Sequence, residues 1–354
     1  MRVNVFMLGL LLTAAACSKN KTTMPPPAQG DYQLTDLVAD VTDFGAASVD
    51  HSLVNAWGIA VNPQGIIWVS ANHSGASTVY DSTGKTLLGP VAIPSQGAHF
   101  GGSPTGIVFN TTSDFAMPGT GLLSRFIFVN EDGTVSAWAM GDSTITVADR
   151  SAGDAVYKGL AISGDHGTNN FLFAADFKGK KIDVFDKNFT YVGGGAFSDP
   201  GIPDDFGPFN IRNVGGQIFV TYAKLKAPDN EDDQAGPGNG YIDIFNPDGT
   251  LVRRFASQGP LNSPWGIAQA PAGSGFPFHS ILVGNFGDGR INIYDSTGIF
   301  LGQVQSNGQP VTIEGLWALD FPYNEAPKID PQKLYFTAGP ADENHGLFGF
   351  IRMR

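Results

Sequence analysis

The sequence predicts an all-β protein folded as a six-bladed β-propeller, in which an N-terminal strand completes the last blade. The first observation is a repeated phrase, because W-G-I-A and Y-D-S-T-G occur in the same order in segments 55–84 and 262–298. The second is the period of about 50 residues between copies, the size of a four-stranded blade. The third is composition, since short apolar runs separated by Gly, Pro, Asn and Asp are typical of all-β proteins.

Six copies of the unit align on one residue of the first strand in each. These residues are Gly58, Gly106, Gly159, Asn210, Gly266 and Ala318. In each copy, a short apolar run is followed by a turn, by a second run that ends at a polar loop, and by an alternating third strand. In five copies the third strand ends in an aromatic residue: Tyr80, Trp138, Phe185, Phe245 and Tyr294. The pattern predicts a single propeller over residues 31–354.

The sixth copy has only three predicted strands, the last at 346–352. Without a fourth strand, this third strand would expose a row of unpaired backbone donors and acceptors. The segment 32–40 alternates apolar and polar residues and precedes the first copy without a blade of its own. We therefore expect 32–40 to pair with 346–352 as the outer strand of the last blade.

The first 30 residues predict export and a lipid anchor. Arg2 is followed by a short apolar run and by small residues directly before Cys17, the only cysteine. The run is shorter than the ~20 apolar residues that span a bilayer. Small residues before a cysteine resemble the bacterial lipoprotein signal, which implies cleavage before Cys17 and lipid attachment there; an ordinary signal peptide is the alternative. We expect a signal peptide at 1–16 and a disordered tether at 17–30.

The charge balance limits the partners of the chain. There are 33 acidic against 21 basic residues, a net charge of −12. Nucleic acid is not expected as a partner, because affinity for it comes mainly from Lys and Arg on phosphates. We expect a monomer in the bacterial cell envelope, on the periplasmic side or facing outward at the outer membrane. Its contact with the membrane should come from the lipid.

Several phrases resemble known propellers. The segments A-A-D-F-K-G-K-K-I-D-V-F-D (174–186) and V-G-N-F-G-D-G-R-I-N-I-Y-D (283–295) resemble NHL repeats. The phrases V-Y-K-G-L-A (156–161) and L-Y-F-T-A-G-P-A-D-E-N-H-G-L-F-G (334–349) are similar to an uncharacterised family of secreted bacterial propellers, some with a PEP-CTERM sorting tail. The resemblance covers about residues 31–354. It implies a secreted six-bladed propeller and brings no catalytic residue with it.

Polar residues near the loops between second and third strands suggest a ligand site. Such loops share one face of a propeller, so their polar groups surround a concave mouth, the usual form of a ligand site. The alternative for each residue is turn chemistry, because Asn and Asp favour tight turns. The mouth is expected to take a protein, peptide or saccharide ligand. The candidate residues are Asn72, Glu131, Asp176, Lys224, Asn285, Asp342 and His345.

Two functions stay open at this point. The first is a binding or scaffold module, because the chain has no G-x-S-x-G, P-loop or dinucleotide motif. The second is a hydrolase or lactonase that depends on a divalent metal at the mouth, because calcium-dependent propeller enzymes ring one ion with similar residues. The N-G-L and P-N-D phrases of those enzymes are missing here. The candidate ligands of that ion are Asn72, Glu131, Asp176, Asn285 and Asp342.

The longest insertion, 225–240, suggests a second place for a metal. It holds Asp229, Glu231, Asp232 and Asp233. Calcium takes 6–8 oxygen ligands, so this loop could bind Ca²⁺, although its spacing is not that of an EF-hand. A solvated acidic loop is the alternative.

Three tryptophans recur at one position of the first strand. They are Trp57, Trp265 and Trp317. Aromatic residues at repeat-locked positions favour packing between blades over a platform for sugars, because aromatic side chains dominate core burial.

Overall fold

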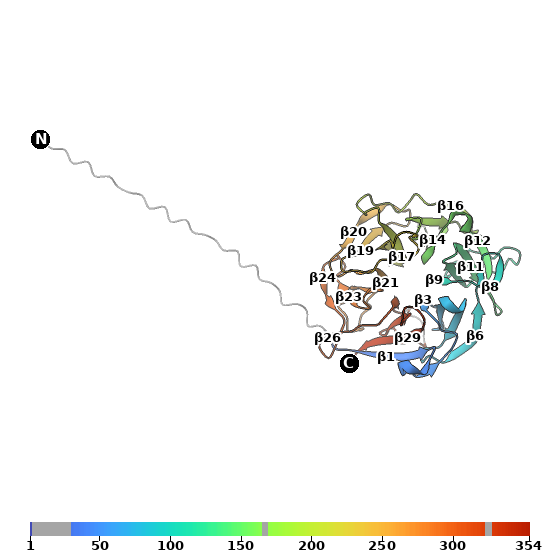
Figure 1. Cartoon of the computed structure of the whole chain (residues 1–354), viewed down its shortest axis with the longest axis horizontal. Coiled ribbons are helices and arrows are strands. Elements are labelled where there is room, and N and C mark those ends of the chain that lie inside the picture. Colours follow the sequence, from blue (N-terminus) through green and yellow to red (C-terminus); the bar gives the residue numbers. More distant parts are fainter. Residues whose placement is uncertain (2–29, 165–168, 323–327) are drawn as a thin grey trace.

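The computed structural model describes residue 1 and residues 30–164, 169–322 and 328–354. Six sheets of four or five strands stand around one axis, and they are antiparallel except for the short parallel pair of β1 and β2, so the prediction of an all-β six-bladed propeller is confirmed (Figure 1). The predicted signal peptide and tether, with Cys17, fall outside the described residues. Within the described part of the chain, no helix has the length and apolar character needed to cross a membrane.

In each of the first three blades, four strands run from the axis outward in chain order. Blade 1 contains β3 (Ala56–Val61), β4 (Ile67–Ala71), β5 (Ala76–Tyr80) and β6 (Thr86–Ala92). Blade 2 contains β9 (Pro104–Phe109), β10 (Phe126–Asn130), β11 (Thr134–Trp138) and β12 (Ile145–Asp149). Blade 3 contains β13 (Tyr157–Gly164), β14 (Asn170–Asp176), β15 (Lys181–Phe185) and β16 (Tyr191–Gly193).

The second half of the ring follows the same plan up to its last sheet. Blade 4 contains β17 (Phe206–Val214), β18 (Gln217–Lys224), β19 (Gly240–Phe245) and β20 (Leu251–Ser257). Blade 5 contains β21 (Pro264–Gln269), β22 (Ile281–Asn285), β23 (Ile291–Tyr294) and β24 (Phe300–Gln303). Blade 6 contains β27 (Leu316–Asp320), β28 (Leu334–Ala338), β29 (Leu347–Met353), β1 (Tyr32–Ala39) and β2 (Ser48–Val49).

Short elements decorate the connections between blades. Two small ribbons pair β7 (Pro94–Ser95) with β8 (Ala98–Gly101) and β25 (Gln305–Ser306) with β26 (Gln309–Pro310). The described helices are single 3-10 turns: η1 (Thr42–Phe44), η2 (Asn72–Ser74) and η3 (Ser151–Gly153).

The two ends of the propeller meet in blade 6. Strand β1 pairs antiparallel with β29 from Tyr32 opposite Met353 to Ala39 opposite Leu347, with an irregularity between Asp36 and Val38. Figure 1 shows β1 (blue) alongside β29 (red). The predicted closure by residues 32–40 is therefore confirmed. It gives the third strand of blade 6 a hydrogen-bonding partner, as the edge-strand argument requires.

The small residues that mark the repeat lie where inner strands of neighbouring blades approach closely. A Cβ atom on Gly106 would come within 2.4 Å of the backbone nitrogen of Leu160 in blade 3. A Cβ atom on Gly159 would come within 2.3 Å of the side-chain oxygen of Asn210 in blade 4. The repeat therefore keeps a small residue at these positions because the six inner strands pack tightly around the axis.

Aromatic side chains fill the spaces between blades. For example, Trp68 of blade 1 stacks on Phe126 of blade 2, with ring centroids 4.3 Å apart. The recurring Trp57, Trp265 and Trp317 are all buried and contact one another near the axis. The expectation that these tryptophans pack between blades is confirmed. Two of them also take part in the site described next.

Candidate ligand site at the axial mouth

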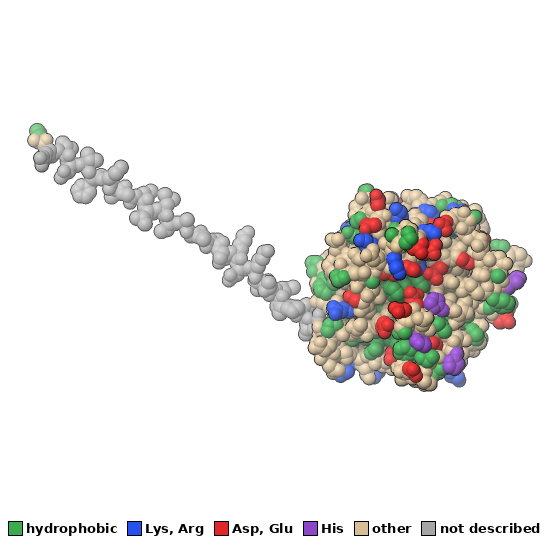
Figure 2. Space-filling view, viewed as in Figure 1, with side chains coloured by type: hydrophobic (Ala, Val, Ile, Leu, Met, Phe, Trp, Pro, Cys, Tyr) green, Lys and Arg blue, Asp and Glu red, His purple; other side chains and the backbone are tan. Residues whose placement is uncertain are grey.

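A cavity of about 920 Å³ opens at the face that carries the loops between second and third strands. Residues of blades 1, 3, 4, 5 and 6 line it, and the insertion 225–240 of blade 4 forms part of its wall. Figure 2 shows this face of the ring, with Asp and Glu side chains gathered around the centre. We call this cavity the acidic mouth.

The floor of the acidic mouth is a column of three stacked rings. Trp57 and Trp317 lie nearly parallel with centroids 3.6 Å apart, and Phe286 stacks on Trp317 at 3.9 Å. The ammonium group of Lys158 lies 5.1 Å from the Trp57 ring centroid, within the range of a cation–π interaction. Phe286 is the half-buried member of the column, so it offers the accessible aromatic surface.

Lys158 is the only buried basic side chain among the described residues that line the acidic mouth. It is the second residue of β13, and 3% of its side chain is exposed. Its Nζ lies 2.5 Å from Oε1 of Glu131 and 3.7 Å from Oδ1 of Asp232. Burial acts to lower the pKa of Lys158, but Glu131, Asp232 and Glu343 outweigh it and hold that pKa above its ordinary value. Lys158 is therefore charged.

Glu131 and Asn72 complete this network. Oε2 of Glu131 accepts a hydrogen bond of 3.0 Å from Nδ2 of Asn72, on the 3-10 turn η2. Burial acts to raise the pKa of Glu131, but Lys158 and the hydrogen bond from Asn72 prevail and keep it below its usual range. The carboxylate is therefore ionised and already paired with Lys158.

Glu343 faces the same group from blade 6. Its Oε2 accepts a 2.6 Å hydrogen bond from Nδ2 of Asn55, whose Oδ1 accepts one of 2.9 Å from the Trp317 indole. Burial raises the pKa of Glu343 to about 7, and repulsion from Glu131 and Asp232 adds to this, while Lys158 and Asn55 offset it in part. Three carboxylates thus surround one ammonium group.

The backbone that presents Glu343 is strained. Ala341, Asp342 and Glu343 have φ values of 55°, 52° and 65°, the left-handed region that residues with a Cβ rarely adopt. The turn is held by hydrogen bonds from the Glu343 nitrogen to the Gly339 oxygen (3.1 Å) and from the Ala341 nitrogen to Oε1 of Glu314 (3.1 Å). Such strain clusters at functional sites, and here it sets the direction of an acidic side chain at the mouth.

The structure brings some of the predicted site residues together. Asn72 and Glu131 are bonded to each other beside the mouth, and Asp342 lines it. Asp176 instead serves turn chemistry, because its Oδ1 accepts bonds from the backbone nitrogens of Val156 (3.1 Å) and Gly179 (3.0 Å).

Three further predicted residues make contacts away from the mouth. Asn285 donates to the backbone oxygen of Pro260 at 2.8 Å, and Lys224 pairs with Asp205 at 3.4 Å. His345 Nδ1 lies 2.8 Å from Oδ2 of Asp40. The imidazole therefore helps to fix the chain that leads from β1 to blade 1.

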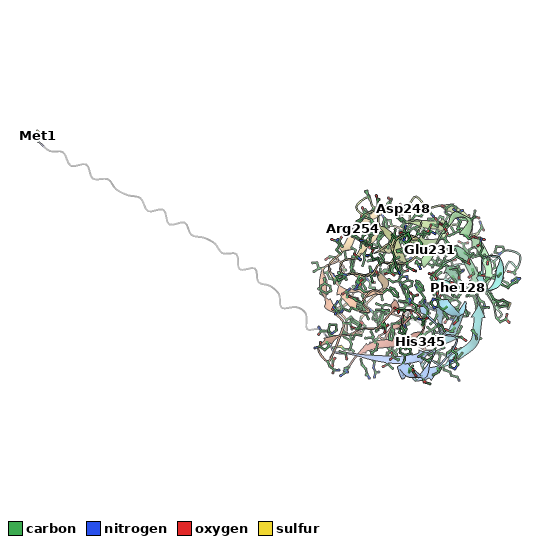
Figure 3. The ribbon with its side chains drawn as sticks, in the orientation of Figure 1. Met1, Phe128, Glu231, Asp248, Arg254 and His345 are labelled. Carbon is green, nitrogen blue, oxygen red and sulfur yellow. The ribbon has the colours of Figure 1, made fainter. Side chains whose placement is uncertain are left out.

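The acidic insertion uses its carboxylates for ion pairs. Glu231 lies 2.8 Å from the ammonium of Lys178, Asp232 faces Lys158, and Asp229 is exposed. Asp233 is partly buried, and burial raises its pKa. Figure 3 shows Glu231 and His345 on either side of the ring centre. Among the described residues, no three His, Cys, Asp or Glu side chains lie close enough together to hold a metal ion.

The candidate residues predicted from the sequence do not include two central residues, Lys158 and Glu343. Lys158 occupies the position directly before the aligned residue, where four other blades have Trp57, Phe209, Trp265 and Trp317 and blade 2 has Thr105. A charged residue at a mostly aromatic position was therefore the available signal. Glu343 follows the candidate Asp342, but its orientation depends on the left-handed turn, which has no glycine to announce it.

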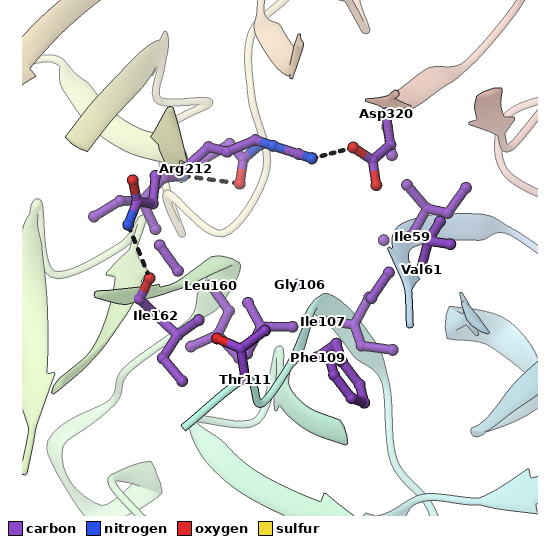
Figure 4. A pocket seen from close by; sticks show the side chains of 18 of the residues that line it. Ile59, Val61, Gly106, Ile107, Phe109, Thr111, Leu160, Ile162, Arg212 and Asp320 are labelled. Atoms are coloured by element: carbon purple, nitrogen blue, oxygen red, sulfur yellow. Dashed lines mark hydrogen bonds and ion pairs between the residues drawn. The ribbon is translucent and has the colours of Figure 1, made fainter. Parts of the chain in front are cut away.

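The opposite end of the axis carries a second, smaller cavity of about 420 Å³ (Figure 4). Aliphatic side chains such as Val61, Ile107 and Leu160 line it together with polar residues such as Asn213. Its charged residues are Arg212 and Asp320, which form an ion pair. Burial raises the pKa of Asp320, and Arg212 offsets this in part. We call this cavity the aliphatic mouth.

Comparison with known proteins identifies relatives and the fold. No family model matches the chain. Uncharacterised protein L690 of Acanthamoeba polyphaga mimivirus is 40% identical over 86% of this chain and 82% of its own length, and uncharacterised protein R648 of the same virus is 39% identical over 92% and 82%.

Solved structures resemble the chain in fold alone. A streptogramin B lyase aligns with a TM-score of 0.56 at 11% identity, over 92% of this chain and 98% of that one. The soluble aldose sugar dehydrogenase of Escherichia coli aligns with a TM-score of 0.54 at 13% identity, over 91% and 100%. Both resemble this chain in overall fold. At this level of identity they carry no catalytic residue over to this chain.

Proposed function

This chain belongs to the family of the two uncharacterised mimivirus proteins, and we propose that it is a binding module whose ligand occupies the acidic mouth. The observation that carries the proposal is the aromatic column of Trp57, Trp317 and Phe286, which ends at the ammonium group of Lys158. It gives one concave site a flat apolar surface and fixed polar groups, the combination typical of ligand sites.

The site is held in place before any ligand arrives. Its polar groups are tied to inner strands and to each other, as in the bonds from Asn72 to Glu131 and from Asn55 to Glu343. A rigid site loses little conformational freedom on binding, which favours affinity. The geometry therefore supports recognition of a ligand by a preformed surface.

The test is a ligand screen read by tryptophan fluorescence, because Trp57 and Trp317 line the mouth. The mature protein is titrated with small amines, carboxylates, saccharides, short peptides and lactones. We expect at least one class to change the emission and to raise the melting temperature, as ligands that bind the native state do. Phe286→Ala should abolish both effects, since it removes the accessible ring of the column.

Phe278→Ala is the matched control, because Phe278 is 64% exposed and lies at the opposite face of the ring. It should leave binding unchanged. If no class binds, or if both variants lose binding equally, the proposal is wrong. Turnover of an ester or lactone that requires added calcium, zinc or manganese would instead support the metal-dependent hydrolase.

We also propose that the protein is held in the bacterial cell envelope by a lipid on Cys17. The support is the signal-like sequence before this cysteine and the absence of any other cysteine. Changing Cys17 to Ser should move the protein from the membrane fraction to the soluble fraction, because one acyl chain alone anchors only marginally and the lipoprotein modification adds several. Unchanged membrane association of the Cys17→Ser protein would contradict the anchor.

A further inference from the structure

We propose that the acidic mouth selects ligands that present an organic cation, an ammonium or guanidinium group, to the carboxylates of Glu343 and Asp232. This inference rests on the proposed binding function and names the chemical class that the site takes. It does not depend on where the cation comes from, which can be a free amine or a Lys or Arg side chain of a peptide.

The first observation is an imbalance of charge. Two lysines line the acidic mouth against five acidic side chains: Lys158 and Lys226, with Asp232, Asp233, Glu314, Asp342 and Glu343. One ammonium group serves several carboxylates: Lys158 Nζ lies 2.5 Å from Glu131 and 3.7 Å from Asp232, and among the described residues Glu343 forms no ion pair. A ligand cation would lie between like charges that now repel each other.

The second observation is the aromatic column. An ammonium or guanidinium group is attracted to the face of an aromatic ring, and its alkyl stem packs on apolar surface. Phe286 offers its half-buried ring next to the acidic side chains of the mouth. Lys158 already makes the same kind of contact with Trp57 from within the protein.

The third observation is an unpaired donor. The indole Nε1 of Trp57 is buried and has no hydrogen-bond partner among the described residues, although Trp57 lines the mouth. Unsatisfied buried donors are uncommon and each requires an explanation. A ligand that carries an acceptor beside its cation, as the carbonyl of a peptide does, is a candidate partner for this donor.

The experiment compares three probes of similar size that differ in charge: the N-acetyl amides of lysine, norleucine and glutamate. Binding to the mature protein is measured by calorimetry at pH 8. We expect the lysine probe to bind at least about tenfold more tightly than the norleucine probe, and the glutamate probe to bind least. N-acetyl-arginine amide should behave like the lysine probe, and n-butylamine tests whether a free amine is sufficient.

Glu343→Gln keeps the shape of the side chain and removes its charge. It should weaken the lysine probe by about tenfold and leave the norleucine probe unchanged. Asp142→Asn, at an exposed acid between β11 and β12 that does not line the acidic mouth, is the matched control and should have little effect. Circular dichroism verifies that both variants are folded.

The outcomes separate the two proposals. Equal binding of the neutral and cationic probes, or preference for the glutamate probe, would overturn cation selection, while Phe286-dependent binding of any probe would leave the binding function intact. An unchanged affinity of Glu343→Gln for the lysine probe would also overturn the inference. If neither these probes nor the wider panel binds at the mouth, both proposals fail together.

Discussion

The two ends of the propeller axis are built from the same six inner strands, yet they differ in chemistry. The acidic mouth holds a lysine that is 3% exposed among three carboxylates and rests on stacked aromatic rings. The aliphatic mouth holds one ion pair, in which the Arg212 side chain is 31% exposed, among Val, Ile and Leu side chains. The acidic mouth therefore has more acidic than basic side chains, whereas the two charged side chains of the aliphatic mouth pair with each other.

This difference shows that, in a repeat fold, the residues that hold the blades together and the residues that line the site occupy different positions of the same strands. Residues in the middle of the inner strands, such as Gly106 and Gly159, are fixed by contact with the next blade. Residues at the start of these strands face the acidic mouth and vary from blade to blade without disturbing that contact. A lysine can therefore replace an aromatic residue at position 158 in one blade, and the ring still closes.

The largest expected effect contrasts the cations of the two mouths, Lys158 and Arg212. Lys158→Met should lower the free energy of unfolding by about 3–5 kcal/mol, because removing one partner of a buried pair leaves the other charge uncompensated. Arg212→Met should cost less, since water reaches Arg212. Denaturant titration at pH 7.5 measures both. Equal losses would mean that the two ends are energetically equivalent.

The double variant Lys158→Met with Glu131→Gln sharpens this comparison. It removes both members of the close pair, and replacing a whole buried pair is often nearly neutral. We expect it to recover most of the stability that Lys158→Met loses. A double variant as unstable as the single one would show that Glu131 is not the charge left uncompensated.

The next effect concerns pH. The folded-state pKa of Glu343 is about 7, against an ordinary value of 4.5, so the folded chain holds a proton that the unfolded chain releases between these values. The resulting stabilisation is complete below the ordinary value and is lost as pH rises through about 7. Glu343→Gln should therefore be about 1–3 kcal/mol more stable than the natural chain at pH 8, and no more stable at pH 4.

The same titration predicts how pH changes binding. Protonation of Glu343 removes a charge from the site, so the lysine probe should bind more weakly at pH 6 than at pH 8, and Glu343→Gln should lose this dependence. If the affinity of Glu343→Gln for the lysine probe still depended on pH, a group other than Glu343 would be responsible. The charged groups that face Glu343 or share its rim are Lys158, Glu131, Asp232, Asp233, Lys226, Glu314 and Asp342, and His73 acts electrostatically on Glu131.

A smaller effect compares the aromatic residues of the two faces. Phe286→Ala should lower the free energy of unfolding by about 1–2 kcal/mol, because it removes a half-buried ring that stacks on Trp317. Phe278→Ala should change it by less than about 0.5 kcal/mol, as expected for an exposed position. Thermal melts of the two variants side by side measure the two losses of stability. A larger loss for Phe278→Ala would show that the ring at the opposite face contributes more to stability than Phe286.

The smallest expected effect is at the acidic insertion. Glu231→Gln removes an exposed ion pair with Lys178, and such pairs contribute little, so the melting temperature should not change measurably. Repeating the melts with excess calcium tests the metal hypothesis for this loop. A calcium-dependent rise in the natural chain that disappears in Glu231→Gln would show that the insertion binds the ion.

The fold could be predicted from the sequence because copies of a repeat occupy equivalent places in the ring, so that aligned residues indicate which strands lie next to one another. The aligned Gly58 and Gly266 mark equivalent positions of two blades, and the unpaired segment 32–40 had one available edge. The site was harder to predict, because residues of one type have different roles. Asn72 bonds Glu131 at the mouth, whereas Asp176, at the end of a second strand, accepts a bond from Gly179 in its own turn.

The remaining site residues depend on three-dimensional detail that no spacing encodes. Glu343 is directed by a left-handed turn of three non-glycine residues, and its environment combines blades 1, 2, 3 and 6 with the insertion of blade 4. Lys158 could have been found because it is the charged residue at a position that is aromatic in four of the six copies. Its partner Glu131 could not be assigned, because the distance between blades at the axis follows from the closed ring.

The ladder between β1 and β29 has a consequence for the order of events in the cell. Strand β1 leaves the ribosome before any blade, but its partner is complete only when residue 353 has been made. Until then, β1 has no antiparallel partner strand, and blade 6 has no outer strand. Contacts of this sequence separation are slow to form. A chain that is threaded through a membrane pore before it folds would benefit, because the ring stays open until synthesis of its last strand.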